Sequence, residues 1–190
     1  MKKAAALLTA LALITFCFPF TLAEEAAEPA SRILVVYFSA TGTTRGVAEK
    51  LAEGLSADLY EIVPAEPYTS ADLNYNNSRS RTSIEMDDPA CRPAIAGELP
   101  DLSAYDTILI GYPIWWGDAP RILSSFVEQV DLSGKTLAVF FTSGSSGLGS
   151  SMRHLEQQSG AGTWLEGRRF TGRTTVEELV NWAGSLGIEP

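Results

Sequence analysis

The stretch ILVVYFSATGTTRGVAEKLAEGL, residues 33–55, decides the fold class of this 190-residue chain. Its first six residues, Ile33–Phe38, are all apolar, as expected of a strand that is buried on both faces of a sheet. In the second half, Val47, Leu51 and Leu55 recur at helical spacing. A buried strand that leads through a short loop into an amphipathic helix is the repeating unit of a parallel α/β sheet.

The rest of the chain repeats this alternation. Further apolar runs predict strands at Leu59–Val63, Thr107–Tyr112, Leu137–Phe141 and Thr163–Leu165, the last of which could extend to Phe170. Helices are predicted at Thr44–Leu55, Ala71–Glu85, from Pro120 on, at Gly147–Gln158, and after Thr174 and Glu177, which have capping-box spacing. Five β-α pairs predict an α/β fold with a five-stranded parallel, doubly wound sheet in a single domain.

The N-terminus has the pattern of a secretory signal peptide. Lys2 and Lys3 form a short basic end, and Ala4–Leu22 is largely apolar. The predicted segments are therefore a signal peptide at residues 1–23, a polar lead-in at residues 24–31 and the domain at residues 32–188. We expect an exported protein in the periplasm, at the cell surface or in the medium. The alternative is an uncleaved segment, which at this length could anchor the chain in a membrane.

The net charge of −9 restricts the classes of partner. Cleavage would remove Lys2 and Lys3 and lower the net charge to about −11. Such acidity disfavours nucleic acids and anionic membrane surfaces. It suits a partner with a basic docking patch, and a plainly solvated acidic surface explains it equally well. Cys91 would be the single cysteine left, so we expect an unpaired bystander and no disulfide framework.

Hydroxyl groups crowd the loop between the first strand and its helix, Ser39-Ala40-Thr41-Gly42-Thr43-Thr44. The free amides at the start of a helix attract an anion, and a glycine lets the backbone approach it closely. The lysine of nucleotide-triphosphate loops is missing, and so is the glycine pattern of dinucleotide sites. A single phosphate monoester therefore fits best. The alternative is a simple helix cap in a turn rich in hydroxyls.

Two further loops end at the same edge of the predicted sheet, where doubly wound folds bind ligands. Tyr112, Trp115 and Trp116 belong to the loop after the third strand, and their rings suit a flat aromatic ligand. One core tryptophan and one that covers it are the alternative. Asp118 is expected to be a turn residue or a helix cap. The loop at residues 142–149 is small and polar, so a molecule with one phosphate and a flat heteroaromatic ring, flavin mononucleotide (FMN), matches all three loops.

From Ser31 to about Ile188 the chain resembles the flavodoxin-like family of the short-chain type. The loop at residues 39–44 is similar to the family's phosphate loop. GYPIWWGDAP, residues 111–120, and TSGSSGLGSS, residues 142–151, resemble one bacterial branch. The resemblance implies strand order 2-1-3-4-5 and FMN as the cofactor. It also implies the cofactor-binding residues, which are Ser39, Ala40, Thr41, Gly42, Thr43 and Thr44 at the phosphate, Pro113, Ile114, Trp115, Trp116 and Gly117 at the ring, and Thr142, Ser143, Gly144 and Gly147 at the pyrimidine edge.

Four of these positions carry particular expectations from the resemblance. Trp116 would stack on the flavin ring, with Trp115 lining the same pocket. Gly117 matches the position whose peptide turns to accept a hydrogen bond from the reduced flavin. Ala40 departs from the hydroxyl residue that is commoner there, which removes one donor.

The predicted function is an FMN-dependent electron carrier outside the cytoplasm, with a redox partner protein or a small-molecule acceptor. One alternative is an NAD(P)H-dependent enzyme that reduces quinones or similar acceptors. The other is a flavin-free ligand-binding module with the same fold. No general acid stands out, because His154 is expected to be solvated. Tyr68, Tyr75 and Arg79 could reach the open side of the flavin, but a packing or surface role is the expectation.

Overall fold

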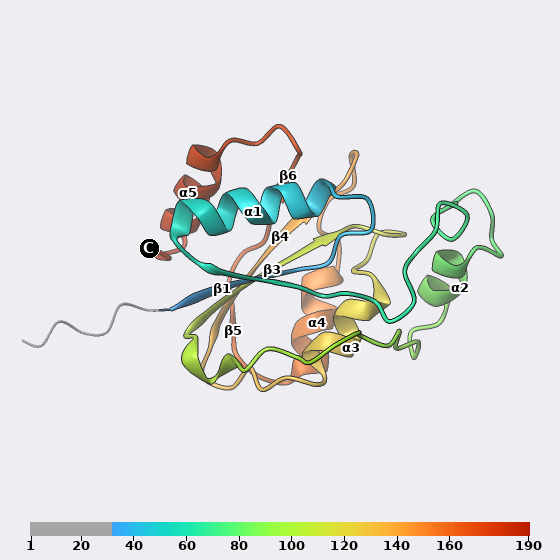
Figure 1. Ribbon diagram of the computed structural model, residues 1–190, viewed down its shortest axis with the longest axis horizontal. Coiled ribbons are helices and arrows are strands. Elements are labelled where there is room, and N and C mark those ends of the chain that lie inside the picture. The colour runs from blue at the N-terminus through green and yellow to red at the C-terminus, as the bar shows by residue number, and fades with distance from the viewer. Residues whose placement is uncertain (1–31) are drawn as a thin grey trace, which may run out of the picture.

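The computed structural model describes residues 32–190 and shows a twisted sheet with helices on both faces (Figure 1). The predicted signal peptide and lead-in, residues 1–31, lie outside the described residues. Within residues 32–190, no helix has the length and apolar character needed to cross a bilayer. The predicted α/β architecture is confirmed.

The paired strands of the sheet all run parallel. β1 (Ile33–Tyr37) lies between β2 (Asp58–Glu61) and β3 (Thr107–Pro113), and β4 (Thr136–Thr142) follows β3. The predicted fifth strand is divided into two, β5 (Thr163–Trp164) and β6 (Arg168–Phe170), which pair with opposite ends of β4. The order β2-β1-β3-β4-β5 confirms the predicted doubly wound sheet.

Helices cover both faces of the sheet. Figure 1 shows α1 (Thr43–Leu55) and α5 (Val176–Ser185) on one face, and α3 (Arg121–Val127) and α4 (Ser151–Ser159) on the other. Successive side chains of β1 alternate between two buried clusters, so that Val35 packs with α1 and α5 and Val36 packs with α3. Each fully buried side chain of this kind contributes about 1.5–3 kcal/mol, and the two clusters therefore fix the helices to the sheet.

Close packing between neighbouring strands explains the glycine in β3. Gly111 lies opposite Phe140 of β4, whose ring is fully buried. A Cβ atom at Gly111 would lie 2.1 Å from Cζ of Phe140, far inside van der Waals contact. The first residue of GYPIWWGDAP therefore makes room for a core ring.

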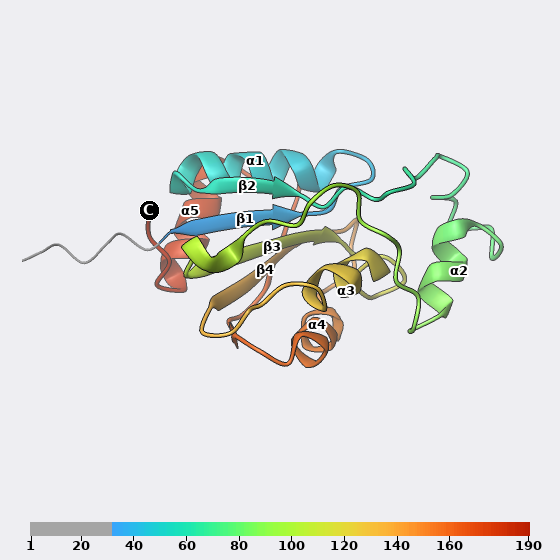
Figure 2. The same ribbon diagram turned by 60° about the horizontal axis from the view of Figure 1, so that its bottom comes forward.

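The predicted helix over Ala71–Glu85 is wrong for residues 71–80, and only its last five residues belong to a helix. The chain runs through turns until α2 (Arg81–Asp87), which Ser80 caps with its side chain. Oδ1 of Asn74 and Oδ1 of Asn77 each accept a hydrogen bond from the backbone N–H two residues further on. Asparagine side chains compete with helical hydrogen bonds in this way. The short helix α2 lies beyond the carboxyl ends of the strands (Figure 2).

Two further helices begin later than predicted. The capping box of α5 is formed by Thr175 and Glu178, one residue beyond Thr174 and Glu177. Thr174 instead accepts a hydrogen bond within the preceding turn. α4 begins at Ser151, four residues later than predicted, because the glycine-rich segment before it forms a turn.

Candidate functional site

The loop between β1 and α1 ends the first strand at the carboxyl edge of the sheet. Thr41, Gly42 and Thr43 are exposed. Gly42 is the N-cap residue of α1, and no side chain of the described residues caps this helix. Ser39 instead accepts a hydrogen bond from the N–H of Gly42 over 3.1 Å. The interpretation as a hydroxyl cap is therefore wrong, and the start of α1 suits an anion.

Thr44, in contrast, is buried. Its Oγ1 lies 2.8 Å from Oγ1 of Thr142, which is also buried at the end of β4. Pro113 pairs with Thr142 across the strands, and the N–H of Ile114 donates to the carbonyl oxygen of Thr142 over 2.9 Å. Thr142 thus ties together the loops after β1 and β3, and the hydroxyl of Thr44 already has one partner.

Arg45 follows the loop but turns its charge away from it. Its guanidinium donates hydrogen bonds to the hydroxyl of Tyr37, over 3.3 Å, and to the carboxylate of Glu61. The charge of Arg45 is thereby neutralised beside β2. Backbone amides and hydroxyls are the groups that the loop offers to an anion, in keeping with the missing phosphate-binding lysine.

The loop after β3 forms a tight turn around two residues in left-handed conformation. Trp115 and Asp118 exchange two backbone hydrogen bonds of 2.9 Å, which enclose Trp116 and Gly117. Trp116 has a φ of 47° and Gly117 a φ of 80°, as in a type I′ turn. A bulky residue is rare in this conformation and points to a functional constraint. The turn presents Trp116 to solvent, with 48% of its surface exposed.

Trp115 is fixed from behind by other rings. It packs edge-to-face against Phe38, at 5.4 Å between ring centroids, and against Tyr68 at 5.2 Å. The hydroxyl of Tyr68 donates to Glu85 over 2.6 Å, and Arg81 lies over the Tyr68 ring. Burial and the bond to Glu85 raise the pKa of Tyr68, so its hydroxyl stays protonated. Tyr68 therefore has the packing role that was predicted.

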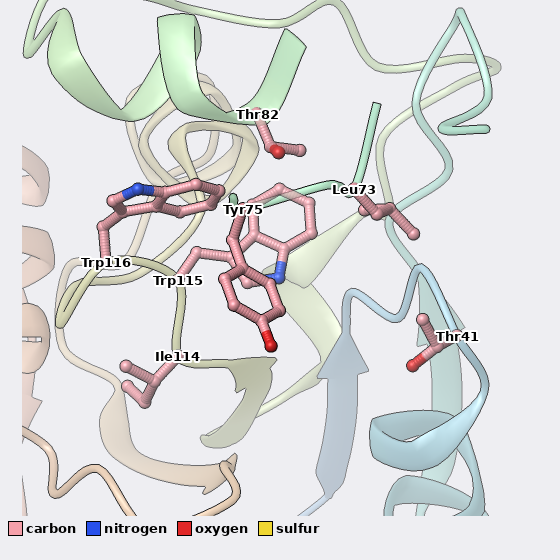
Figure 3. A pocket seen from close by; sticks show the side chains of 7 residues that line it. All are labelled: Thr41, Leu73, Tyr75, Thr82, Ile114, Trp115 and Trp116. Atoms are coloured by element: carbon pink, nitrogen blue, oxygen red, sulfur yellow. The ribbon is translucent and has the colours of Figure 1, made fainter. Parts of the chain in front are cut away.

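A cavity of about 340 Å³ connects the phosphate loop with the aromatic turn, within the usual size range of small-molecule sites. Figure 3 shows the residues that line it, which are Thr41, Leu73, Tyr75, Thr82, Ile114, Trp115 and Trp116. Four of them come from the predicted cofactor-binding set. Leu73 and Thr82 were missed, because the segment that carries them was predicted as a helix in which only Tyr75 and Arg79 were considered for reach to the ligand. Tyr75 is 73% exposed, as expected of a surface residue, and it also lines the cavity.

Comparison with known proteins places this chain in a family. A family model described as flavodoxin matches residues 32–186, nearly all of the described chain. The chain belongs to the flavodoxin family. No curated protein matches it significantly.

Solved structures of flavoproteins resemble this flavodoxin-family chain over most of its length. A candidate flavoprotein from Bacteroides eggerthii is 48% identical, with a TM-score of 0.79, and the match covers 84% of this chain and 99% of that one. Another from Bacteroides uniformis is 42% identical, with a TM-score of 0.77 and coverage of 82% and 99%. A flavoprotein from Lactobacillus acidophilus, solved in complex with FMN, is 25% identical, with a TM-score of 0.62 and coverage of 74% and 93%.

The loop after β4 is set apart from the cavity in this member of the flavodoxin family. Ser143, Gly144 and Gly147 are absent from the lining of the 340 Å³ cavity. Oγ of Ser143 donates to the carbonyl oxygen of Ser146, and the carbonyl oxygen of Gly144 accepts from Arg169 over 3.2 Å. These bonds stay within the loop or reach to β6, so the role of this loop at a pyrimidine edge stays a prediction.

Asp118 and His154, neither of which was expected to act as a catalyst, contact each other. Oδ1 of Asp118 accepts from the N–H of Ala119 over 2.8 Å, which confirms Asp118 as a turn residue. Its Oδ2 lies 3.2 Å from a guanidinium nitrogen of Arg121 and 3.0 Å from Nδ1 of His154. The prediction of a solvated His154 missed this contact, although half of the side chain is exposed. Burial raises the pKa of the Cys91 thiol, which disfavours a reactive thiolate.

Proposed function

We propose that the protein binds FMN at the carboxyl edge of its sheet and carries electrons outside the cytoplasm. The observation that supports this most is that one cavity extends from the loop suited to an anion to the aromatic turn. Thr41 lies at one end of the cavity, beside the uncapped start of α1, and Trp115 and Trp116 lie at the other. Membership of the flavodoxin family and the likeness to a flavoprotein that was solved with FMN support the same cofactor.

The residues present fit FMN. Thr41, Thr43 and the amides at the start of α1 suit a phosphate monoester, which needs no metal ion or lysine. Trp116 offers an exposed indole face for the flavin ring, and Trp115 is held rigidly behind it. When bound, FMN supplies the redox chemistry, and the chain supplies its position and its surroundings.

A carrier role is favoured over catalysis by what lines the cavity. The lining contains hydroxyl, aliphatic and aromatic side chains, with no carboxylate, histidine or lysine among the described residues. A reductase whose protein supplies the substrate proton uses a general acid within hydrogen-bond reach, most often a histidine or a carboxylic acid, and the phenol of Tyr75 is the acid in this lining. The aromatic wall and the net acidity of the chain disfavour extra negative charge on the reduced cofactor, which favours a low reduction potential.

Titration of the purified protein with FMN tests the proposal. We expect saturable binding at a 1:1 ratio, with quenching of tryptophan fluorescence. The bound cofactor should be reduced by a partner reductase or dithionite, with no steady oxidation of NAD(P)H by the protein alone. Steady oxidation of NAD(P)H would indicate the enzyme instead. Absence of any FMN uptake would reject both and leave a flavin-free ligand-binding module.

Export is a separate part of the proposal and rests on the N-terminal composition. Lys2, Lys3 and the apolar Ala4–Leu22 have the order of a signal peptide. The mass of the protein isolated from its native cells tests this. A chain that starts at Glu24 in the exported fraction is the expected result, whereas full-length protein in the soluble cytoplasm would contradict export.

A further inference from the structure

A second cavity, of about 710 Å³, adjoins the first one. Tyr75 and Trp116 line both cavities, so their side chains form a shared wall. Figure 3 shows the indole of Trp116 close to the helix that carries Thr82, which is α2. The other residues of the second lining come from α2 and the segments on either side of it, and are Asn76, Ser78, Ser83, Ile84, Met86, Asp87 and Asp88. Apart from Tyr75 and Trp116, none of these lining residues belongs to the FMN site proposed above.

Exposed apolar surface gathers at this second cavity. Tyr75 is 73% exposed, Ile84 57% and Trp116 48%, and all three belong to its lining. Two aromatic faces and an aliphatic side chain around a hollow of this size suit a flat organic molecule. Isolated exposed apolar residues are common, but a cluster of them around a cavity marks a binding surface.

The charge of the cavity restricts the ligand. Asp87 ends α2 and Asp88 follows it, and neither carboxylate forms an ion pair within residues 32–190. Arg92 interacts electrostatically with Asp88. Its guanidinium, however, donates two hydrogen bonds of 2.8 and 2.7 Å to the carboxylate of Glu128. The Arg121 guanidinium donates to the carbonyl oxygen of Met86 in the same lining, but it also contacts Asp118. The two carboxylates without an ion pair therefore disfavour anions such as the pyrophosphate of a nicotinamide dinucleotide and favour neutral or cationic ligands.

We propose that this second cavity binds the electron acceptor, a flat, neutral or cationic organic molecule such as a quinone. The inference rests on the proposed FMN-dependent function. A quinone held there lies against the Tyr75–Trp116 wall, whose other side faces the first cavity. It gains two electrons as FMN returns from its reduced to its oxidised form. It also takes up two protons, from the reduced cofactor or from water, to give the hydroquinone.

Two quinones that share one ring system test the charge preference. One carries a trimethylammonium group and the other a sulfonate group. The full chain is loaded with FMN and reduced anaerobically, and its reoxidation by each quinone is followed by absorbance. We expect the cationic quinone to react faster by about tenfold at low salt, and the preference to weaken as salt is added. Equal rates for the two quinones would overturn the proposal.

A pair of double variants locates the effect. Asp87→Asn with Asp88→Asn should bring the two rates close to one another. The matched control is Asp101→Asn with Asp131→Asn, which removes the same charge just before β3 and β4, at the opposite end of the sheet. Asparagine can still accept the backbone hydrogen bonds that these two aspartates accept. An unchanged preference in the first variant, or an equal loss in both, would contradict the assignment.

A binding measurement separates this inference from the FMN proposal. The protein loaded with oxidised FMN is titrated with the cationic quinone. The indole N–H of Trp116 and the backbone amide of Ile84 are followed by NMR. Saturable shifts at both groups are expected, and FMN uptake is measured in its own titration. Shifts centred on Thr41 and Trp115 would place the quinone in the first cavity and reject the proposal. An absence of saturable shifts would also reject it and leave this face to a protein partner.

Discussion

The carbonyl oxygen of Gly117 lies so close to Gly149 that a Cβ atom at Gly149 would be 2.9 Å from it. Gly149 also has a φ of 58°, a left-handed conformation that favours glycine. Gly117 forms the aromatic turn with Trp116, and Gly149 lies in the loop after β4. The second loop therefore supports the first through a contact that leaves no room for a side chain.

Gly149→Ala should displace the aromatic turn. We expect FMN affinity to fall several-fold and the tryptophan emission to change, because the Gly117 carbonyl must move. Gly160→Ala is the matched control, since Gly160 has a φ of 60° with nothing within 4 Å of its Cβ position. Both variants bear the left-handed cost of about 1–2 kcal/mol in stability. Unchanged FMN affinity in Gly149→Ala would show that the turn does not depend on this contact.

Trp116→Ala should weaken FMN binding and leave the fold intact. Loss of an aromatic face from a stacked ring costs about 1–3 kcal/mol, or about 5- to 150-fold in affinity. Trp182 is buried and packs edge-to-face on Phe170, so Trp182→Ala should lower the free energy of unfolding by about 3–5 kcal/mol instead. Titration with FMN and urea unfolding separate the two effects. Equal losses of FMN affinity would reject Trp116 as the platform.

The buried hydroxyl pair of Thr44 and Thr142 should behave as a unit. Thr142→Val leaves the Thr44 hydroxyl without its partner and should cost about 1–3 kcal/mol of stability. The double variant with Thr44→Val should cost less than the two single variants added together. Urea unfolding of the three variants gives the coupling energy, and a value of zero would contradict the bond. If Thr44 also holds the phosphate, FMN affinity falls further in Thr44→Val than in Thr142→Val.

The pair of Arg92 and Glu128 should add a small, pH-dependent term to stability. Hydrogen bonds from Arg92 hold the pKa of Glu128 below its ordinary value of 4.5. A carboxylate with a depressed pKa stabilises the fold above its ordinary pKa, and the effect disappears as the pH falls through the folded pKa. Glu128→Gln should therefore lower stability at pH 7 by at most about 1 kcal/mol, because 30% of the Arg92 side chain and 36% of the Glu128 side chain are exposed.

Urea unfolding at several pH values checks this, with Arg92→Gln as the second variant. The two variants should lose the same stability at pH 7 and approach the parent protein in acid. A deficit of Glu128→Gln that persists in acid would mean that the side chain stabilises the fold by packing and not by charge.

Part of the site was predictable because its signals are local. The hydroxyl loop after β1 and the two tryptophans after β3 stand out in the sequence, and the parallel sheet brings their loops to one edge. The segment around Tyr75 was not predictable in the same way. Its composition favoured a helix, whereas side-chain bonds of Asn74 and Asn77 hold it in turns over the cavity.

The sequence alone predicted the strand-helix alternation, the order of the elements along the chain and a first loop suited to an anion. These depend on neighbours within one strand or one turn of helix. Tertiary structure decided that Trp115 is packed while Trp116 is exposed, and that Thr44 bonds to Thr142. It also placed Asp87 and Asp88 in one cavity lining with Trp116. Such contacts join residues far apart in the chain, and no local pattern records which of them meet.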